Sequence, residues 1–93
     1  MEYKEYKNIP NALRKYRRIR GLKQKQVAQI LGLSSASRIS RWENGECLPS
    51  LVNAIRLSIL CRNMVDGLFG DLMKRLREEI LLREQEILKS KDS

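Results

Sequence analysis

The feature that constrains this chain most is a glycine between two short amphipathic runs. Residues 23–31 carry apolar side chains at helical spacing, which predicts a helix with one buried stripe. The stripe consists of Val27, Ala28, Ile30 and Leu31. Gly32 follows, and glycine adopts the positive φ of a tight turn without steric cost. Only three residues separate this helix from the next predicted one, so the two helices must meet at a steep angle.

A second short helix is expected over residues 35–44, with Ser34 as its N-cap. Ile39 and Trp42 are three residues apart and share one side, so we expect them to anchor this helix in the core. The other edge carries short or basic side chains, namely Ser35, Ser37, Arg38 and Arg41. Short side chains permit close approach to DNA base edges, and arginine binds guanine through two hydrogen bonds. The pattern favours a helix that enters the major groove of DNA.

Three further helices are expected: residues 10–20, a helix that follows Ser50 as its N-cap, and a last helix from about Asp66. They would complete the core with Leu13, Tyr16, Leu51, Ala54, Ile55, Leu57, Ser58, Leu60, Cys61, Val65, Leu68, Phe69 and Leu72. Leu, Ile, Arg, Glu and Lys dominate the chain, and only five Gly and two Pro are available for turns. The predicted fold is therefore all-α, with five helices and the last one extended at the C-terminus.

The extended last helix has no breaker between Gly70 and about Lys89. Its apolar positions follow a short heptad pattern with one arginine in it. The pattern is Phe69, Met73, Leu76, Ile80, Arg83 and Ile87, broadened by Leu72, Leu81, Leu82 and Leu88. A 93-residue fold can hardly bury all of this surface against four small helices. We therefore favour self-association through this helix; the alternative is that it folds back onto its own domain.

The charge of the chain is positive and uneven. Its formal net charge is +8. Residues 1–46 contain 11 Lys and Arg against 4 Asp and Glu, whereas residues 47–93 contain 8 against 7. The basic excess lies with the two short helices, which indicates an anionic partner, nucleic acid first.

The chain lacks the residues that most enzymes and metal sites use. It has no histidine, so it can form neither a Ser-His-Asp nor a Cys-His catalytic arrangement. It also has no Gly-rich phosphate-binding loop. Cys47 and Cys61 lack metal-ligand spacing; we expect Cys61 in the core and Cys47 partly exposed. No stretch approaches the roughly 20 apolar residues of a membrane span. We expect a cytoplasmic, non-enzymatic protein without metal or cofactor.

Two stretches, "LRKYRRIRGLKQKQVAQILGLS" and "ISRWENGECLPSLVNAIRLS", resemble the Cro/C1-type (XRE, phage repressor-like) helix-turn-helix family. The resemblance implies a lambda-repressor-like DNA-binding domain over residues 10–69. A polar arm over 1–9 precedes it, and a helical extension over 70–93, a possible dimerisation element, follows it. The implied function is sequence-specific binding of double-stranded DNA by a homodimer that represses transcription.

The resemblance also implies roles for single residues. Gln24 would bind a phosphate and brace the second short helix, and Asn44 would offer its side chain or N–H to another phosphate. Arg17 and Glu43 would form an ion pair between helices. The base contacts would come from Ser35, Ser37, Arg38 and Arg41. Lys23 and Lys25 are candidate phosphate contacts from their charge alone. Alternatives remain: Arg38 and Arg41 could contact only phosphates, and Gln24 could be a plain surface residue.

Two departures from the family pattern affect these assignments. Lys23 stands where the family has Ser or Thr, so the first short helix lacks its usual cap. Ile39 follows Gly32 by seven residues, whereas the family spacing is six, which shifts the side chains that face DNA. The rival function is that of an antitoxin whose C-terminal helix binds a toxin while the protein represses its own operon. An RNA-binding role is less favoured, because aromatic stacking residues are nearly absent.

Overall fold

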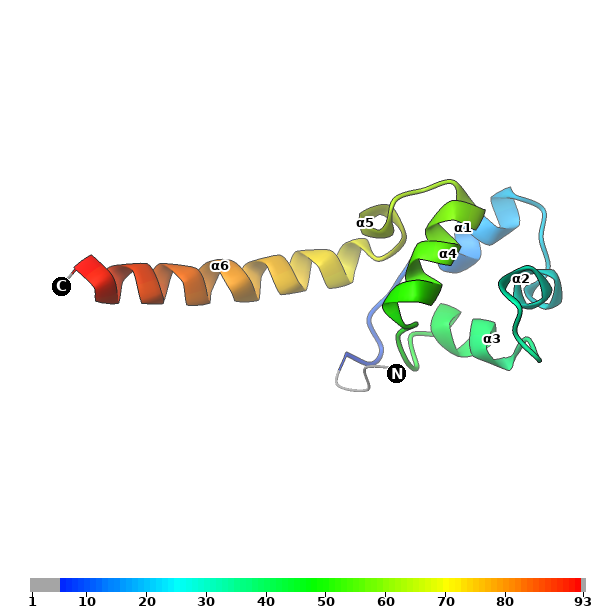
Figure 1. Cartoon of the computed structure of the whole chain (residues 1–93), viewed down its shortest axis with the longest axis horizontal. Coiled ribbons are helices and arrows are strands. Elements are labelled where there is room, and N and C mark those ends of the chain that lie inside the picture. The colour runs from blue at the N-terminus through cyan, green and yellow to red at the C-terminus, as the bar shows by residue number, and fades with distance from the viewer. Residues whose placement is uncertain (1–5, 93) are drawn as a thin grey trace.

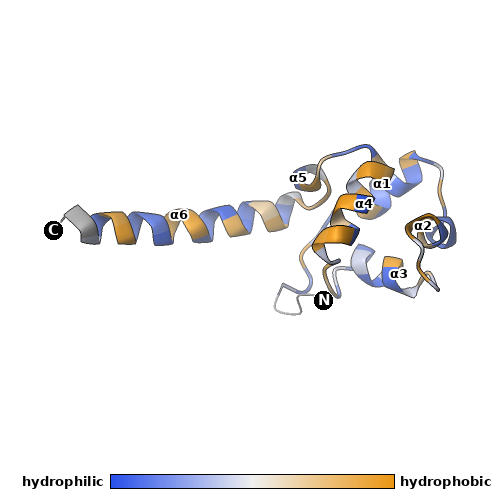
Figure 2. Cartoon of the chain, viewed as in Figure 1, coloured by the Kyte–Doolittle hydropathy of each residue, from blue (hydrophilic) through white to orange (hydrophobic). Residues whose placement is uncertain are grey.

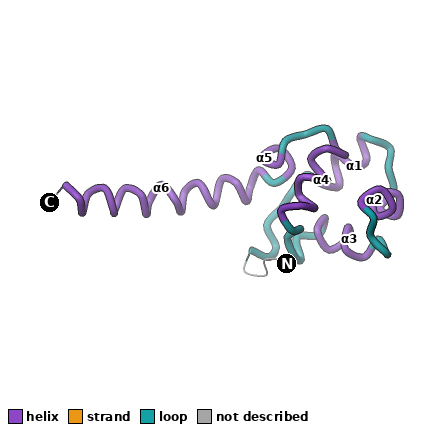
Figure 3. Tube along the Cα trace, viewed as in Figure 1, coloured by secondary structure: helices purple, strands orange, loops and turns teal. Residues whose placement is uncertain are grey.

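The computed structural model describes residues 6–92, which form six helices and no strand (Figures 1 and 3). The helices are α1 (Leu13–Ile19), α2 (Gln24–Leu31), α3 (Ser37–Glu43), α4 (Leu51–Cys61), α5 (Val65–Leu68) and α6 (Gly70–Asp92). The predicted all-α class is confirmed. Helices α1 to α5 gather around one core, and α6 projects from them along the longest axis of the molecule (Figure 1).

The core receives apolar side chains from each of α1 to α5. Trp42 and Leu68 are the most deeply buried large side chains, with exposed fractions of 1% and 0%. Complete burial of one such side chain stabilises a fold by about 1.5–3 kcal/mol. The remaining buried apolar residues are Leu13, Val27, Ala28, Leu31, Ile39, Cys47, Ala54, Leu57, Cys61 and Phe69.

Helix α1 begins later than predicted, and Pro10 lies outside it. The side chain of Asn11 explains this start, because its Oδ1 accepts a hydrogen bond from the Leu13 N–H at 3.0 Å. Asn11 Nδ2 also donates to the Trp42 carbonyl at 2.8 Å, and the Ala12 N–H donates to the Leu68 carbonyl at 2.8 Å. The segment before α1 is therefore tied to α3 and α5 and cannot continue the helix.

Helix α3 also begins two residues later than predicted, and the assignment of Ser34 as its N-cap is wrong. Ala36 is the N-cap and makes no side-chain cap bond. Gly32 ends α2 with φ 76°, and the Leu33 N–H donates back to the Ala28 carbonyl at 2.8 Å. The turn thus spans five residues, 32–36.

Several residues predicted to be buried are exposed. On α4 the buried stripe is Ala54, Leu57 and Cys61, whereas Leu51 is 74% and Ile55 47% exposed. On α2, Ile30 is 59% exposed. These helices carry more apolar surface than the small core can cover, so only the side chains nearest its centre are buried. Ser50 is the N-cap of α4 as predicted, since its Oγ accepts from the Asn53 N–H at 3.2 Å.

Cys47 is buried, so the prediction that it is partly exposed is wrong. The loop that contains it turns at Gly45, where φ is 73°. The Asn8 N–H donates to the Gly45 carbonyl at 2.7 Å, so the N-terminal segment holds this loop against the domain. Cys61 lies in the core, as predicted.

The predicted fifth helix is divided in two at Phe69, whose φ of −123° and ψ of 47° are not helical. Leu68 and Phe69 both enter the core, and the chain leaves it as α6 in a new direction. The molecule therefore measures 56 × 23 × 20 Å. The alternative that the C-terminal helix folds back onto its own domain is contradicted (Figure 1).

Replacing Leu57 by alanine tests the core. Leu57 is 3% exposed, so Leu57→Ala should lower the free energy of unfolding by about 2–5 kcal/mol. Ile59 on the same helix is 72% exposed, so Ile59→Ala should change it by less than about 0.5 kcal/mol. Urea denaturation followed by circular dichroism measures both. Equal effects of the two substitutions would contradict the burial assigned to α4.

Candidate nucleic-acid interface

Helix α3 has one buried and one exposed side. Ile39 and Trp42 are 2% and 1% exposed and fix the buried side in the core. Ser37 and Arg41 are four residues apart, so they share one side of α3, and both are exposed. Arg38 is exposed beside them, and neither arginine forms an ion pair with any side chain of residues 6–90. Two cationic side chains are therefore available to an anionic partner.

Ser35 lies in the turn before α3, close to Ser37. The two hydroxyl oxygens are 2.8 Å apart, and Ser35 Oγ accepts a weak hydrogen bond from the Ser37 N–H at 3.4 Å. Both serines are exposed. The later start of α3 leaves Ser35 outside the helix, so the structure brings the two hydroxyls together at its first turn.

The carboxylate of Glu43 joins three helices at the buried end of α3. Its side chain is 1% exposed. Arg17 on α1 binds it with both Nε, at 2.6 Å from Oε2, and Nη2, at 3.1 Å from Oε1. Gln24 on α2 donates from Nε2 to Oε1 at 3.0 Å. The ion pair expected between Arg17 and Glu43 is present, and it is bidentate.

Arg14 is a member of this cluster that the sequence reasoning missed. Its Nε lies 3.3 Å from Glu43 Oε1, and its Nη2 donates to Asn44 Oδ1 at 2.7 Å. Arg14 and Arg17 are three residues apart, so they lie on the same side of α1. The sequence alone shows that the two arginines share one side of α1. Only the packing of α3 against α1 shows that this side faces Glu43.

Burial and pairing act in opposite directions on the Glu43 carboxyl. Burial raises its pKa, but the hydrogen bonds from Arg17, Gln24 and Arg14 and the positive charge of Arg17 lower the pKa further than burial raises it. The net result is a pKa below the ordinary value of 4.5. The hydrogen bond to Glu43 likewise raises the pKa of Arg17. Both groups are therefore charged at neutral pH.

The residues assigned to phosphate contacts lie at the start of α2 and directly after α3. Gln24 braces α3 through Glu43, as expected, and is half-buried. The Asn44 N–H donates to the Ser40 carbonyl at 2.9 Å, so only the side chain of Asn44 can serve a phosphate. Lys23 and Lys25 are exposed at the start of α2. Gln26 Oε1 accepts from the Lys23 N–H at 2.8 Å, which supplies one half of a capping box although the Lys23 side chain cannot cap.

The described residues offer little support for other kinds of site. Among them no group of three or more His, Cys, Asp or Glu side chains is placed to hold a metal ion. None of the helices described is both long enough and apolar enough to cross a membrane.

Comparisons with known proteins agree with this geometry. A family model for helix-turn-helix proteins matches residues 13–62, which span α1 to α4. The crystal structure of a transcriptional regulator from Listeria innocua is similar to this chain, with a TM-score of 0.55 and 27% sequence identity. The similarity covers 89% of each chain. No curated protein sequence matches the chain.

Replacing Glu43 by glutamine tests the buried charge. Because the pKa of Glu43 is lower in the folded state, its contribution to stability is present at neutral pH. That contribution is lost as pH falls from about 4.5 through the folded pKa. Glu43→Gln should lower the free energy of unfolding at neutral pH by about 1.5–3 kcal/mol. It should also reduce the further decrease in this free energy below pH 4.5.

Urea denaturation at a series of pH values measures this effect. Glu46→Gln, at an exposed position close by, is the matched control and should retain the wild-type stability and its acid dependence. A Glu43→Gln variant with the wild-type acid dependence would contradict the assigned role of Glu43.

Proposed function

Because this chain belongs to the helix-turn-helix family, we propose that it is a DNA-binding transcription regulator whose helix α3 enters the major groove of double-stranded DNA. The protein acts as a repressor and binds as a homodimer to a roughly palindromic site. A bound dimer that covers a promoter excludes the polymerase, which requires no catalysis by the protein itself.

The two-sided character of α3 is the observation that carries this proposal. Ile39 and Trp42 hold one side in the core, and Glu43 is clamped from α1 and α2. The opposite side, with Ser37 and Arg41, is left exposed by a helix whose orientation is fixed. A rigid helix with small and cationic side chains outward can approach base edges closely and in one register.

The site residues divide into two groups by the contacts they make. The base contacts come from Ser35, Ser37, Arg38 and Arg41, with Ser37 and Arg41 nearest the centre of the exposed side. The phosphate contacts come from Gln24, Lys23, Lys25 and Asn44. Contacts to phosphates position a protein on the duplex, whereas contacts to base edges select the sequence. The start of α2 therefore sets affinity, and α3 sets specificity.

Substitution of Arg41 tests the base-reading role of α3. Arg41→Ala should weaken binding to a duplex selected from random sequences by about 10- to 100-fold, because one bidentate base contact is lost. Fluorescence anisotropy with labelled duplex measures it, and circular dichroism verifies that the variant folds. Arg56→Ala on α4, also at an exposed arginine, is the matched control and should bind like the wild type. Specific binding that survives both Arg38→Ala and Arg41→Ala unchanged would refute the assignment.

The salt dependence of binding tests the phosphate-contacting role of α2. Each neutralised phosphate releases condensed cations, so binding should weaken steeply as salt increases. Lys25→Ala should weaken binding to specific and random duplexes equally and reduce the slope of log affinity against log salt by about 1. Lys74→Ala on α6 should leave that slope unchanged. A reduced preference for the selected sequence in Lys25→Ala would instead place Lys25 at the bases.

A further inference from the structure

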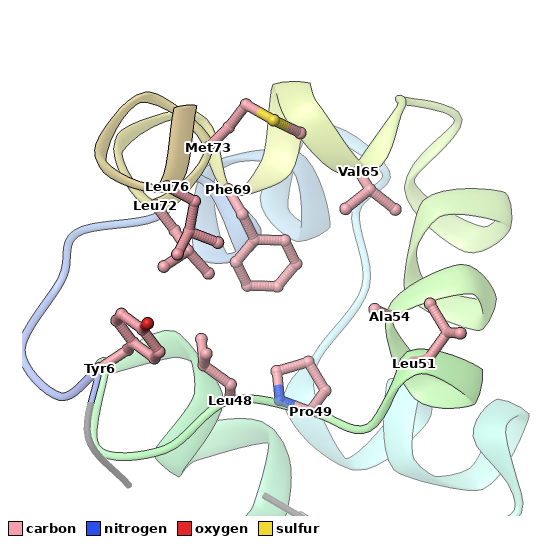
Figure 4. A pocket seen from close by; sticks show the side chains of 10 residues that line it. All are labelled: Tyr6, Leu48, Pro49, Leu51, Ala54, Val65, Phe69, Leu72, Met73 and Leu76. Atoms are coloured by element: carbon pink, nitrogen blue, oxygen red, sulfur yellow. The ribbon is translucent and has the colours of Figure 1, made fainter. Parts of the chain in front are cut away.

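An apolar groove of about 480 Å³ lies between α4 and the first turns of α6 (Figure 4). Leu48, Leu51 and Ala54 line one side, and Leu72, Met73 and Leu76 line the other. In Figure 4 these side chains face one another across an open gap. Leu51 is 74% exposed, so the groove presents apolar surface that residues 6–92 do not cover.

The same side of α6 continues beyond the groove as an uncovered apolar stripe. Met73, Leu76, Ile80 and Ile87 are spaced by three, four and seven residues, so they share one side of the helix. Ile80 and Ile87 are 58% and 61% exposed. Figure 2 shows orange, apolar segments that alternate with polar ones along α6 as it leaves the domain. A second helix laid along this stripe would run directly into the groove.

The distal half of the chain's own α6 cannot fill the groove. Residues 77–92 extend straight away from the domain for about 24 Å, at 1.5 Å per residue (Figure 1). Among the residues that the structure describes, none fills the groove, so we look for its occupant in another molecule.

The charges of α6 indicate which molecule would occupy the groove. Residues 70–93 contain six basic and six acidic side chains, in contrast to the strongly basic first half of the chain. Each half of α6 is neutral overall, but beside the apolar stripe Arg75 and Arg77 come before Ile80, and Glu84 and Glu86 come after it. Two parallel copies would place like charges together. Two antiparallel copies centred between Ile80 and Leu81 place Arg77 of each copy opposite Glu84 of the other, and Arg75 opposite Glu86.

We infer that two copies of this chain pair through antiparallel α6 helices, with Ile87 of each copy inserted in the groove of the other. In the same register Ile87 lies opposite position 74, one residue from Met73, which lines the groove. The contact is isologous, as a two-fold dimer requires. This inference deepens the proposed function, which takes the DNA-binding unit to be a homodimer. It leaves α2 and α3 of both copies away from the paired helices (Figure 1).

Sedimentation of the full chain and its variants tests the interface. The wild type should be a dimer, and Ile80→Asp or Ile87→Asp should raise the dimer dissociation constant at least about 100-fold, because an unpaired charge is buried. Leu51→Asp, in the opposite wall of the groove, should act in the same direction. Leu82 is 62% exposed, like Ile80, but lies on the other side of α6. Leu82→Asp is therefore the matched control and should remain dimeric, with the same helix content by circular dichroism.

Disulfide cross-linking tests the orientation of the two helices. A mixture of the Met73→Cys and Ile87→Cys variants should form a covalent heterodimer under mild oxidation, and Ile87→Cys alone should not cross-link. Cys47 and Cys61 are buried, and the oxidised wild type provides the background. A covalent Ile87→Cys homodimer would overturn the antiparallel orientation. Three results would overturn the interface. The wild type could be monomeric, or Ile80→Asp and Leu82→Asp could have equal effects. The purified chain could also be a monomer that associates only with a toxin-like protein.

The same variants separate this inference from the proposed function. Arg41→Ala should lose duplex binding and remain a dimer. If Ile87→Asp stays dimeric while the wild type binds duplex specifically, the interface is wrong and the function stands. If the interface variants behave as expected while the wild type binds no duplex, the function is wrong and the interface stands.

Discussion

The orientation of α3 depends on one buried carboxylate. Glu43 is almost completely shielded from water, and it receives hydrogen bonds from Arg17 on α1 and Gln24 on α2. Removing water from a carboxylate costs several kcal/mol. The partners of Glu43 more than offset that cost, because they lower its pKa further than burial raises it. Any other crossing of the three helices would leave a buried charge unpaired. The Glu43 cluster thereby fixes the orientation of α3, and this orientation determines where the exposed serines and arginines point.

The surfaces proposed for DNA binding and for pairing of the chain lie apart and differ in charge. The basic excess lies in the first half of the chain, around α2 and α3, where a polyanion would be met. Helix α6 has balanced charges and leaves the domain on another side (Figure 1). A neutral helix can approach its own copy without net repulsion, which the basic half cannot do. Binding to DNA and pairing of the chain therefore need not compete for surface.

Much of the fold and part of the site followed from local patterns. The spacing of Ile39 and Trp42 predicted which side of α3 is buried, and Ser50 identified the start of α4. These inferences succeeded because helix periodicity and capping depend on neighbours within a few residues. The choice among the apolar residues of α4 failed for Leu51 and Ile55, because the helix is apolar around much of its circumference. Only packing against the other helices decides which stripe is covered.

The sequence alone determined the all-α class, the approximate places and order of α1 to α4, and the basic first half. Through a family resemblance it also gave the pairing of Arg17 with Glu43. Tertiary structure decided what no local pattern contains. It placed Arg14 in the Glu43 cluster, delayed the start of α3 to Ser37, and turned the chain at Phe69 so that α6 leaves the domain. Each of these depends on contacts between residues far apart in the chain. A short-range pattern specifies a helix and its faces, but it does not specify the partner that each face meets.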